Sequence, residues 1–533
     1  MTSNPFAMFS PVARMRTLYE SCKGSKDETF QFARFKGESE TELSTIQQNG
    51  TLSKRSSVAA DDTAISNEAF PSDVKEDPGE DVRLHKDRIT EWQAGYNVTN
   101  AIQGMFIVTF PYAVLQGGYW ALFAMVFVAY ICCHTGKILV ECLYEEDANG
   151  VKQRVRNSYV QIAEDAWGKR FGARIVNIAQ FIELLMTCIL YVLLCGDLII
   201  GSFPNTKLNL SIWIFLSSLL LLPCAFLKNL RHVSWLSFWC TVAHMFINAI
   251  IIIFCLTKAG DWHWSAVQIK IDIWTFPISL GIVVFSYTSQ IFLPSLEGNL
   301  VNRSKFNCMM HWTHIAAAAF KALFSWIGFL TFGFDTQEVI TNNLPTQTFK
   351  AIVNLILVIK ALLSYPLPYY AAVELLEQAF FRGKPETRLP SCFSGDNSLK
   401  FWAIILRLML VGLTTLFAIV IPHFSILMGL IGSFTGCMLS FVWPCMFHLK
   451  LRRQKMSRLA IIGDVIIILL GVIFGLVGMY YSGAALIRAF QGESVRPFQG
   501  HLALNVTNRG PTDFGQQPDV LVKPKLESAI VEH

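Results

Sequence analysis

Charged residues are scarce in this sequence. They make up 16% of the 533 residues, whereas a soluble domain carries about a quarter. Hydrophobic residues account for 53%, and the mean hydropathy is +0.41. The apolar residues also gather into long stretches, such as Trp213–Leu227 and Val465–Met479. This combination excludes an ordinary soluble domain and indicates a chain that crosses a lipid bilayer.

The sequence also lacks the short motifs that mark enzymes and nucleotide-binding proteins. It contains no Walker A loop, no GxSxG, no HExxH and no Rossmann fingerprint. Its 13 cysteines include no metal-type CxxC pair, and no run of basic residues interleaved with aromatics suggests nucleic-acid binding. We therefore expect no enzyme activity, no metal or cofactor, and no nucleic-acid partner. Without a nucleotide site, transport would be driven by an ion gradient or run passively.

Eleven apolar segments predict membrane-spanning helices. About 20 apolar residues at 1.5 Å each span a hydrocarbon core of about 30 Å, and lipid offers the backbone no hydrogen-bond partner outside a helix. The predicted spans are 93–116, 117–142, 172–200, 209–227, 232–256, 275–298, 312–333, 349–376, 399–421, 423–448 and 460–490. The polar segments 1–88 and 491–533 predict disordered tails around a transporter domain at 89–490.

Basic residues are unequally divided between the two sets of loops. The loop after the second span carries Lys152, Arg154, Arg156, Lys169, Arg170 and Arg174, whereas the opposite loops hold only Lys207, Lys258, Lys270 and Lys350. Because basic loops stay in the cytosol, we predict a cytosolic N-terminus. An odd number of spans then puts the C-terminal tail in the lumen, with Asn505 as a glycosylation acceptor.

Two of the predicted spans contain helix breakers in matching positions. The first span holds Gly104 and Pro111, and the sixth holds five polar residues, Ser286–Gln290, followed by Pro294. Spans one and six are five apart and therefore run in opposite directions. This pattern predicts an inverted repeat of five plus five helices, in which each broken helix supplies half of a midplane site. Ordinary proline kinks are the alternative.

The breaks also indicate which residues would bind a substrate. Half-helix N-termini present free N–H groups and a positive dipole end, which suit a carboxylate. We predict that the substrate is surrounded by Asn100, Gln103, Gly104, Phe106, Ser286, Tyr287, Thr288 and Gln290.

Three titratable residues near the middle of predicted spans are candidates for proton coupling. Glu183 lies in the third span, Lys360 in the eighth and His244 in the fifth. A charge at the bilayer centre costs about 3 kcal/mol or more, so each should face a partner or water. A Glu183–Lys360 pair would respond to protonation, although a static ion pair is equally compatible. A lone helical histidine is more often a hydrogen-bonded core residue.

Other features favour packing or gating. Gly432–Gly436 and Gly471–Gly475 are spaced for close helix contacts. Glu297, Glu374 and Glu377 fall near cytosolic helix ends, where interfacial residues and gates are both expected.

Four longer strings resemble the vesicular inhibitory amino acid transporters of the amino acid/auxin permease family. They are Glu91–Phe106, Leu222–Leu230, Phe285–Asn299 and Lys360–Pro368, and the similarity extends from about Lys86 to Arg488. Thr109 and Phe110 stand where these relatives have Gly-Leu, a difference that bears on substrate preference.

The resemblance implies an all-α membrane fold of eleven helices with a ten-helix LeuT-like core. It also implies loading of GABA and glycine into synaptic vesicles, in exchange for protons that a vacuolar proton pump supplies. Two alternatives stay open. One is a proton-coupled amino acid permease of the plasma membrane or lysosome, and the other is a receptor that binds amino acid without transporting it.

Overall fold

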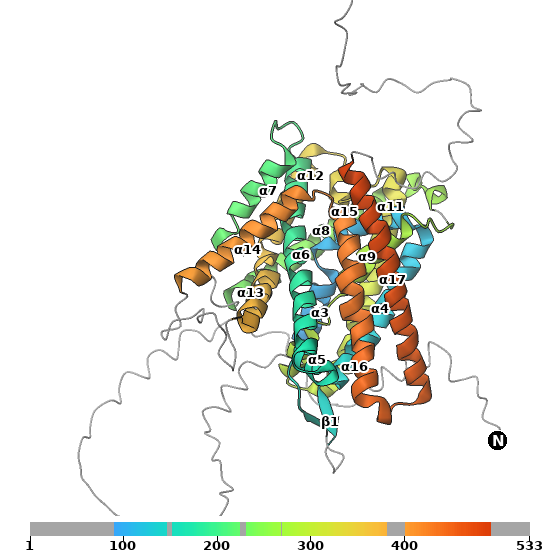
Figure 1. Cartoon of the computed structure of the whole chain (residues 1–533). Coiled ribbons are helices and arrows are strands. Elements are labelled where there is room, and N and C mark those ends of the chain that lie inside the picture. The colour runs from blue at the N-terminus through green and yellow to red at the C-terminus, as the bar shows by residue number, and fades with distance from the viewer. Residues whose placement is uncertain (1–89, 147–151, 224–230, 268, 381–399, 492–533) are drawn as a thin grey trace, which may run out of the picture.

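The computed structural model describes residues 90–146, 152–223, 231–267, 269–380 and 400–491 (Figure 1). The predicted tail at 1–88 and nearly all of 491–533, including Asn505, lie outside these residues. So do the side chains of Tyr96, Asn100, Gln103, 231–241 and 378–380.

Helices make up most of the described chain, together with one short hairpin. The elements are α3 (Glu91–Gln103), η2 (Met105–Thr109), α4 (Phe110–Glu141), β1 (Tyr144–Glu146), β2 (Lys152–Arg154), α5 (Tyr159–Trp167), α6 (Phe171–Ser202), α7 (Leu210–Leu219), α8 (Arg231–Thr257), η4 (Ala259–Asp261), η5 (Trp264–Ala266), α9 (Phe276–Tyr287), α10 (Leu293–Gly298), η6 (Arg303–Lys305), α11 (Phe306–Phe332), η7 (Gly333–Asp335), η8 (Ile340–Asn343), α12 (Gln347–Ser364), α13 (Pro366–Phe380), α14 (Phe401–Val420), α15 (Phe424–Ile431), the π-helical turns η9 (Gly432–Gly436) and η10 (Met438–Val442), α16 (Trp443–Arg452), η11 (Arg453–Lys455) and α17 (Arg458–Phe490).

Seven of the described helical segments are long and apolar enough to cross a membrane. They are Met105–Glu141, Phe171–Ser202, Arg303–Asp335, Gln347–Glu377, Phe401–Val420, Phe424–Lys455 and Arg458–Phe490, and three shorter apolar helices lie at Leu210–Leu219, Val242–Thr257 and Phe276–Tyr287. The helical membrane fold is therefore confirmed. The total of eleven spans, the tail boundaries and the repeat relation stay predictions.

The long helices stand side by side (Figure 1). In that view α4, α6, α9 and α17 run upright, while β1 and α5 lie at the lower end beside α16. The β1–β2 hairpin and α5 were not predicted, because they are short and lie in a polar loop between two predicted spans. We call this end of the molecule the hairpin face.

Both predicted helix breaks are present. The helix α3 ends at Gln103, and Gly104 leads into the 3₁₀ turn η2. The helix α9 ends at Tyr287, Thr288 is extended, and α10 begins only at Leu293 with Pro294 in its first turn. A simple proline kink would bend a continuous helix, whereas here each helix stops and a new one begins, so the alternative of two proline kinks does not describe the structure. The backbone between the halves of each span is free of regular helical hydrogen bonding, as a midplane site requires.

Glycines fix two further features of the fold. The boundary between the first two spans falls at Gly118, whose φ of 57° lies in the left-handed region that favours glycine. A Cβ on Gly432 would lie 1.9 Å from the carbonyl oxygen of Gly281, and one on Gly471 would lie 2.9 Å from Cβ of Phe441. The prediction that these glycines mediate close helix packing is confirmed.

Candidate functional site

The two broken spans pack directly against each other. The hydroxyl of Ser279 on α9 donates to the carbonyl oxygen of Ala113 on α4 at 2.8 Å, and Thr275 donates to that of Gln116 at 2.7 Å. The turn η9 also packs on α9. The first span, the sixth span and the π-helical part of the tenth therefore meet around the breaks.

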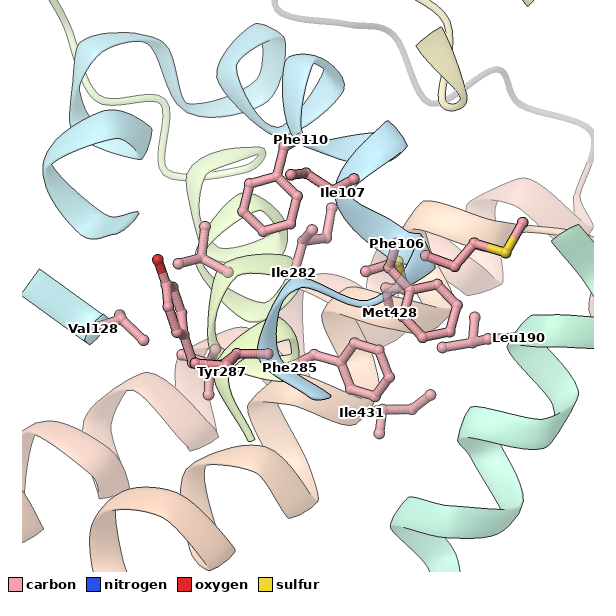
Figure 2. Close-up of a cluster of buried hydrophobic side chains, with 14 of the residues drawn as sticks. Phe106, Ile107, Phe110, Val128, Leu190, Ile282, Phe285, Tyr287, Met428 and Ile431 are labelled. Carbon is pink, nitrogen blue, oxygen red and sulfur yellow. The ribbon is translucent and has the colours of Figure 1, made fainter. Parts of the chain in front are cut away.

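An aromatic cluster closes around the first break. Phe106 is buried, and its ring centroid lies 5.0 Å from that of Tyr191, 5.4 Å from Phe285 and 6.0 Å from Phe424. Figure 2 shows Phe106 beside Phe285, with Leu190 also close by. Phe106, which was predicted to contact substrate, thus lies at the centre of contacts from α6, α9 and α15.

A lysine that was not predicted holds the second break. Lys321 on α11 is fully buried, at 0% exposure. Its Nζ donates to the hydroxyl of Ser286 at 2.8 Å and to the Ser286 carbonyl oxygen at 3.1 Å. The same atom lies 3.5 Å from the ring centroid of Tyr287 and 5.1 Å from that of Phe110, within the range of cation–π attraction.

Lys321 therefore supplies donors where the end of α9 leaves a carbonyl without a helical partner. It could have been found from sequence, because it lies in the predicted span 312–333 and an intramembrane charge marks a functional site by default.

Three buried hydroxyls near the breaks lack a hydrogen-bond partner among the described residues. They are Thr109 Oγ1 in η2, the phenol of Tyr287, and Ser289 Oγ in the segment between α9 and α10. Figure 2 shows Tyr287 on the opposite side of α9 from Phe285, facing Val128. An unpartnered buried hydroxyl is costly, so each of these atoms marks a point where a polar ligand or water could complete the bonding.

The other predicted binding residues divide into two groups. Gln290 is fully bonded to protein, because its amide accepts from Ser440 at 2.8 Å and donates to Thr135 at 3.3 Å. Thr288 donates to the Val284 carbonyl oxygen at 3.1 Å. In this conformation these side chains fix the break rather than face an open space. The side chains of Asn100 and Gln103 lie outside the described residues, and their predicted role stays untested.

Glu183 contacts the π-helical turn that packs on α9. Its buried carboxylate accepts a hydrogen bond from the hydroxyl of Thr435 in η9. The next residue, Gly436, packs so closely that a Cβ there would lie 3.2 Å from Thr288 Oγ1. One carboxylate is therefore connected, through a single residue step, to the broken segment of the sixth span. Because π-helical turns recur at functional sites, this position suits a coupling residue.

Lys360 has a different neighbour from the one predicted, since its Nζ contacts His244 Nδ1. The antiparallel helices α12 and α6 are aligned by Asn354, which donates to the Leu198 carbonyl oxygen at 3.2 Å. Lys360 lies six residues beyond Asn354, which brings it level with Val192 on the antiparallel α6. Glu183 is nine residues further along α6, or about 14 Å away at about 1.5 Å per residue. The predicted Glu183–Lys360 pair is therefore wrong for this conformation.

These features define a class of protein. Apolar helices cross a membrane, two of them are broken side by side, and buried polar groups gather at the breaks. This is the architecture of a secondary transporter for a small polar solute.

The family follows from comparison with known proteins. Residues 87–488 match the family described as "Transmembrane amino acid transporter protein", and the chain belongs to it. The vesicular inhibitory amino acid transporter of Xenopus tropicalis is 52% identical over 427 residues, which cover 79% of this chain and 82% of that protein. The vesicular GABA transporter of Caenorhabditis elegans is 48% identical over 401 residues, covering 75% and 81%. The resemblance seen in the sequence is confirmed.

A solved Na+-coupled sialic acid symporter, in a substrate-bound outward-open state, is also similar. It is 14% identical, with a TM-score of 0.45, and the match covers 78% of this chain and 92% of that one. No structural conclusion follows at that TM-score. Family membership shows that the chain is a membrane transporter of amino acids, whereas its substrate and coupling ion are matters for proposal.

Proposed function

We propose that this chain loads inhibitory amino acids, GABA and glycine, into synaptic vesicles in exchange for lumenal protons. The observation that carries the proposal is the identity of 48–52%, over about three quarters of the chain, to proteins named as vesicular inhibitory amino acid and GABA transporters. The exchange would depend on the gradient that a vacuolar proton pump maintains.

The substrate site in this proposal lies at the two breaks. Backbone N–H groups beside Gly104, together with those of Gln290 and Ile291 between the halves of the sixth span, bind the carboxylate, since helix breaks leave such donors free. The unpartnered hydroxyls of Thr109 and Ser289 bind the other polar end. Phe106 and its aromatic neighbours limit the length of the carbon chain between the two ends.

Glu183 is the proposed proton carrier. Its carboxylate is shielded from water and bonded to Thr435, whose turn packs on the broken segment. Protonation removes the negative charge that Thr435 donates to, which weakens that bond and links proton uptake to the packing of η9 on α9. Lys360 and His244, which contact each other, are the next candidates.

The proposal requires a cytosolic hairpin face and a lumenal C-terminal tail. A cysteine placed at Ser158, at the N-cap of α5, should react with an impermeant thiol reagent only from the cytosol. One placed at Thr512 should react only from the lumen. Reaction of both from the same side would mean an even number of spans and would remove the repeat argument.

The deciding experiment is uptake by proteoliposomes with an imposed pH gradient, acidic inside, and a panel of labelled amino acids. We expect GABA and glycine to accumulate, and Glu183→Gln to exchange substrate at equal pH without accumulating it. Accumulation by Glu183→Gln would remove this residue as the carrier. Binding with no flux in the native chain would indicate a receptor, and accumulation only down an inward proton gradient would indicate a permease.

A further inference from the structure

The second half of the sixth span is held at the hairpin face by one buried carboxylate. Glu297 lies near the end of α10 and is 1% exposed. It accepts a hydrogen bond from the phenol of Tyr144 on β1. Its Oε2 lies 3.6 Å from Nη1 of Arg154 on β2, and its Oε1 lies 3.8 Å from Nε of Arg303 on η6. A single carboxylate thus joins three separate segments.

The two arginines also bind the backbone of α10. Arg154 donates through Nη2 to the carbonyl oxygen of Pro294 at 2.8 Å, and Arg303 donates to that of Gly298 at 3.3 Å. Arg154 approaches so closely that a Cβ on Gly298 would lie 2.3 Å from its Nη1. The six residues of α10 are therefore gripped along their length by guanidinium groups from outside the helix.

The hairpin that provides Tyr144 and Arg154 is itself anchored to the helical core. Arg156, which follows β2, is buried and donates to the carbonyl oxygen of Cys142 at 2.9 Å. It also pairs with Glu145 and with Asp165 of α5. In turn, α5 is fixed by Tyr159, whose hydroxyl donates to the Leu439 carbonyl oxygen at 2.9 Å. The hairpin is a fixed support, and α10 is the part that it holds.

The first half of the first span is fastened at the same face. Glu91, at the start of α3, forms an ion pair with Lys305 at the end of η6. The half-helices α3 and α10 therefore both end in polar contacts at this face. Each is separated from the rest of its span by non-helical backbone, at Gly104 and at 288–292. Such half-helices can move without distorting the long helices around them.

We propose that Tyr144, Arg154, Arg303 and Glu297 form a gate that closes the substrate site toward the hairpin face. The gate rests on the proposed transport function, because only a transporter needs this face to open and close. Entry from the hairpin face requires α10 to leave the hairpin, and the four side chains are what bind it there. Gly298 is part of the device, since only a residue without a side chain admits Arg154 this closely.

The test measures access to the site, not transport. A reporter cysteine replaces Ser289, a buried residue between α9 and α10, in the full chain in membranes. An impermeant thiol reagent is applied from the hairpin face. The chain without the reporter gives the background labelling, which should be low because the free cysteines in the described part of the chain are buried. Gly298→Ala is the principal variant, because the added methyl displaces only the mobile end of Arg154. Gly412→Ala, whose added Cβ meets nothing within 4 Å, is the matched control.

We expect Gly298→Ala and Glu297→Gln to label about fivefold faster or more, the factor that one lost hydrogen bond gives in an open-to-closed ratio. Gly412→Ala should label at the native rate. If Glu297→Gln fails to fold, Tyr144→Phe, outside the membrane, takes its place. Native labelling rates in folded gate variants, or equal acceleration from both faces, would overturn the proposal. Because the reagent needs no substrate or proton gradient, faster labelling of the gate variants, combined with no GABA accumulation by the native chain, would refute only the proposed function.

Discussion

Replacing Lys321 by methionine should lower amino acid uptake about 100-fold while leaving the chain folded. The lysine makes two hydrogen bonds to Ser286, one to its hydroxyl and one to its carbonyl oxygen. A buried acceptor left without a donor costs about 1–3 kcal/mol, so removing the lysine from both Ser286 oxygens shifts the equilibrium of the broken helix by about 3 kcal/mol. That free energy corresponds to about a 100-fold smaller population of the conformation that binds substrate.

A double-mutant cycle shows whether Lys321 acts through the break. Ser286→Ala removes only the hydroxyl contact, so uptake should fall about tenfold. In Lys321→Met the Ser286 hydroxyl already has no lysine to bind, so adding Ser286→Ala should lower uptake no further. If Ser286 instead contacts substrate independently of Lys321, the two losses will multiply.

The assay is initial uptake by proteoliposomes that contain equal amounts of purified chain, with thermal unfolding measured in parallel. Lys258→Met, at an exposed lysine, controls for loss of a positive charge. Near-native uptake by Lys321→Met would refute the reasoning. So would a loss explained by unfolding, because methionine keeps most of the packing volume of the side chain.

Three further results are expected. Gly104→Leu should abolish transport without loss of expression, because its long side chain fills the break, and normal uptake by this variant would mean that the site lies elsewhere. Gly104→Ala should retain transport, because its Cβ meets only ordinary contacts, the nearest at 3.7 Å. Gly432→Ala should destabilise the chain by about 3 kcal/mol or more in thermal unfolding, since its Cβ would lie 1.9 Å from a backbone oxygen, while Gly412→Ala should unfold like the native chain. Burial and the neighbouring Glu297 carboxylate raise the pKa of Tyr144 to about 12, so its hydroxyl stays protonated below that pH. Tyr144→Phe should therefore change reporter labelling equally at about pH 6 and about pH 8, and a pH-dependent change would mean that another group titrates.

The sequence was sufficient to predict features that depend on local chemistry. Gly104 and the polar run Ser286–Gln290 interrupt apolar helices wherever those helices pack, so the breaks could be placed without a structure. The glycines at Gly281 and Gly432 show why the rest was harder. Nothing in the sequence singles out Gly281, yet its carbonyl oxygen lies so close to Gly432 that only a glycine fits at position 432.

The pairing of buried charges could not be predicted in the same way. Glu183 and Lys360 are both central in their spans, but a contact also needs the right rotation and relative height of two helices. An offset of about two and a half turns along α6 was enough to give Glu183 the Thr435 hydroxyl and Lys360 the His244 ring. The hairpin contacts were equally hidden, because Tyr144 and Arg154 belong to a polar loop without helical periodicity.

The broken sixth span is restrained at three different levels, and the order of these restraints determines how it can move. Lys321 binds the last turn of α9, deep in the protein, whereas Tyr144 and the two arginines bind α10 at the hairpin face. Between them, Gln290 bonds both to Ser440 of η10 and to Thr135 of α4. Opening the hairpin face breaks the polar contacts of Glu297 and its neighbours and the packing of α10 on α4. The other two sets of hydrogen bonds stay intact, because they do not involve α10. We therefore expect the half-helix to turn about the anchored Gln290 while the end of α9 keeps its place against Lys321. Variants at the gate should thus change how often the site opens, whereas variants at Lys321 should change whether the site exists.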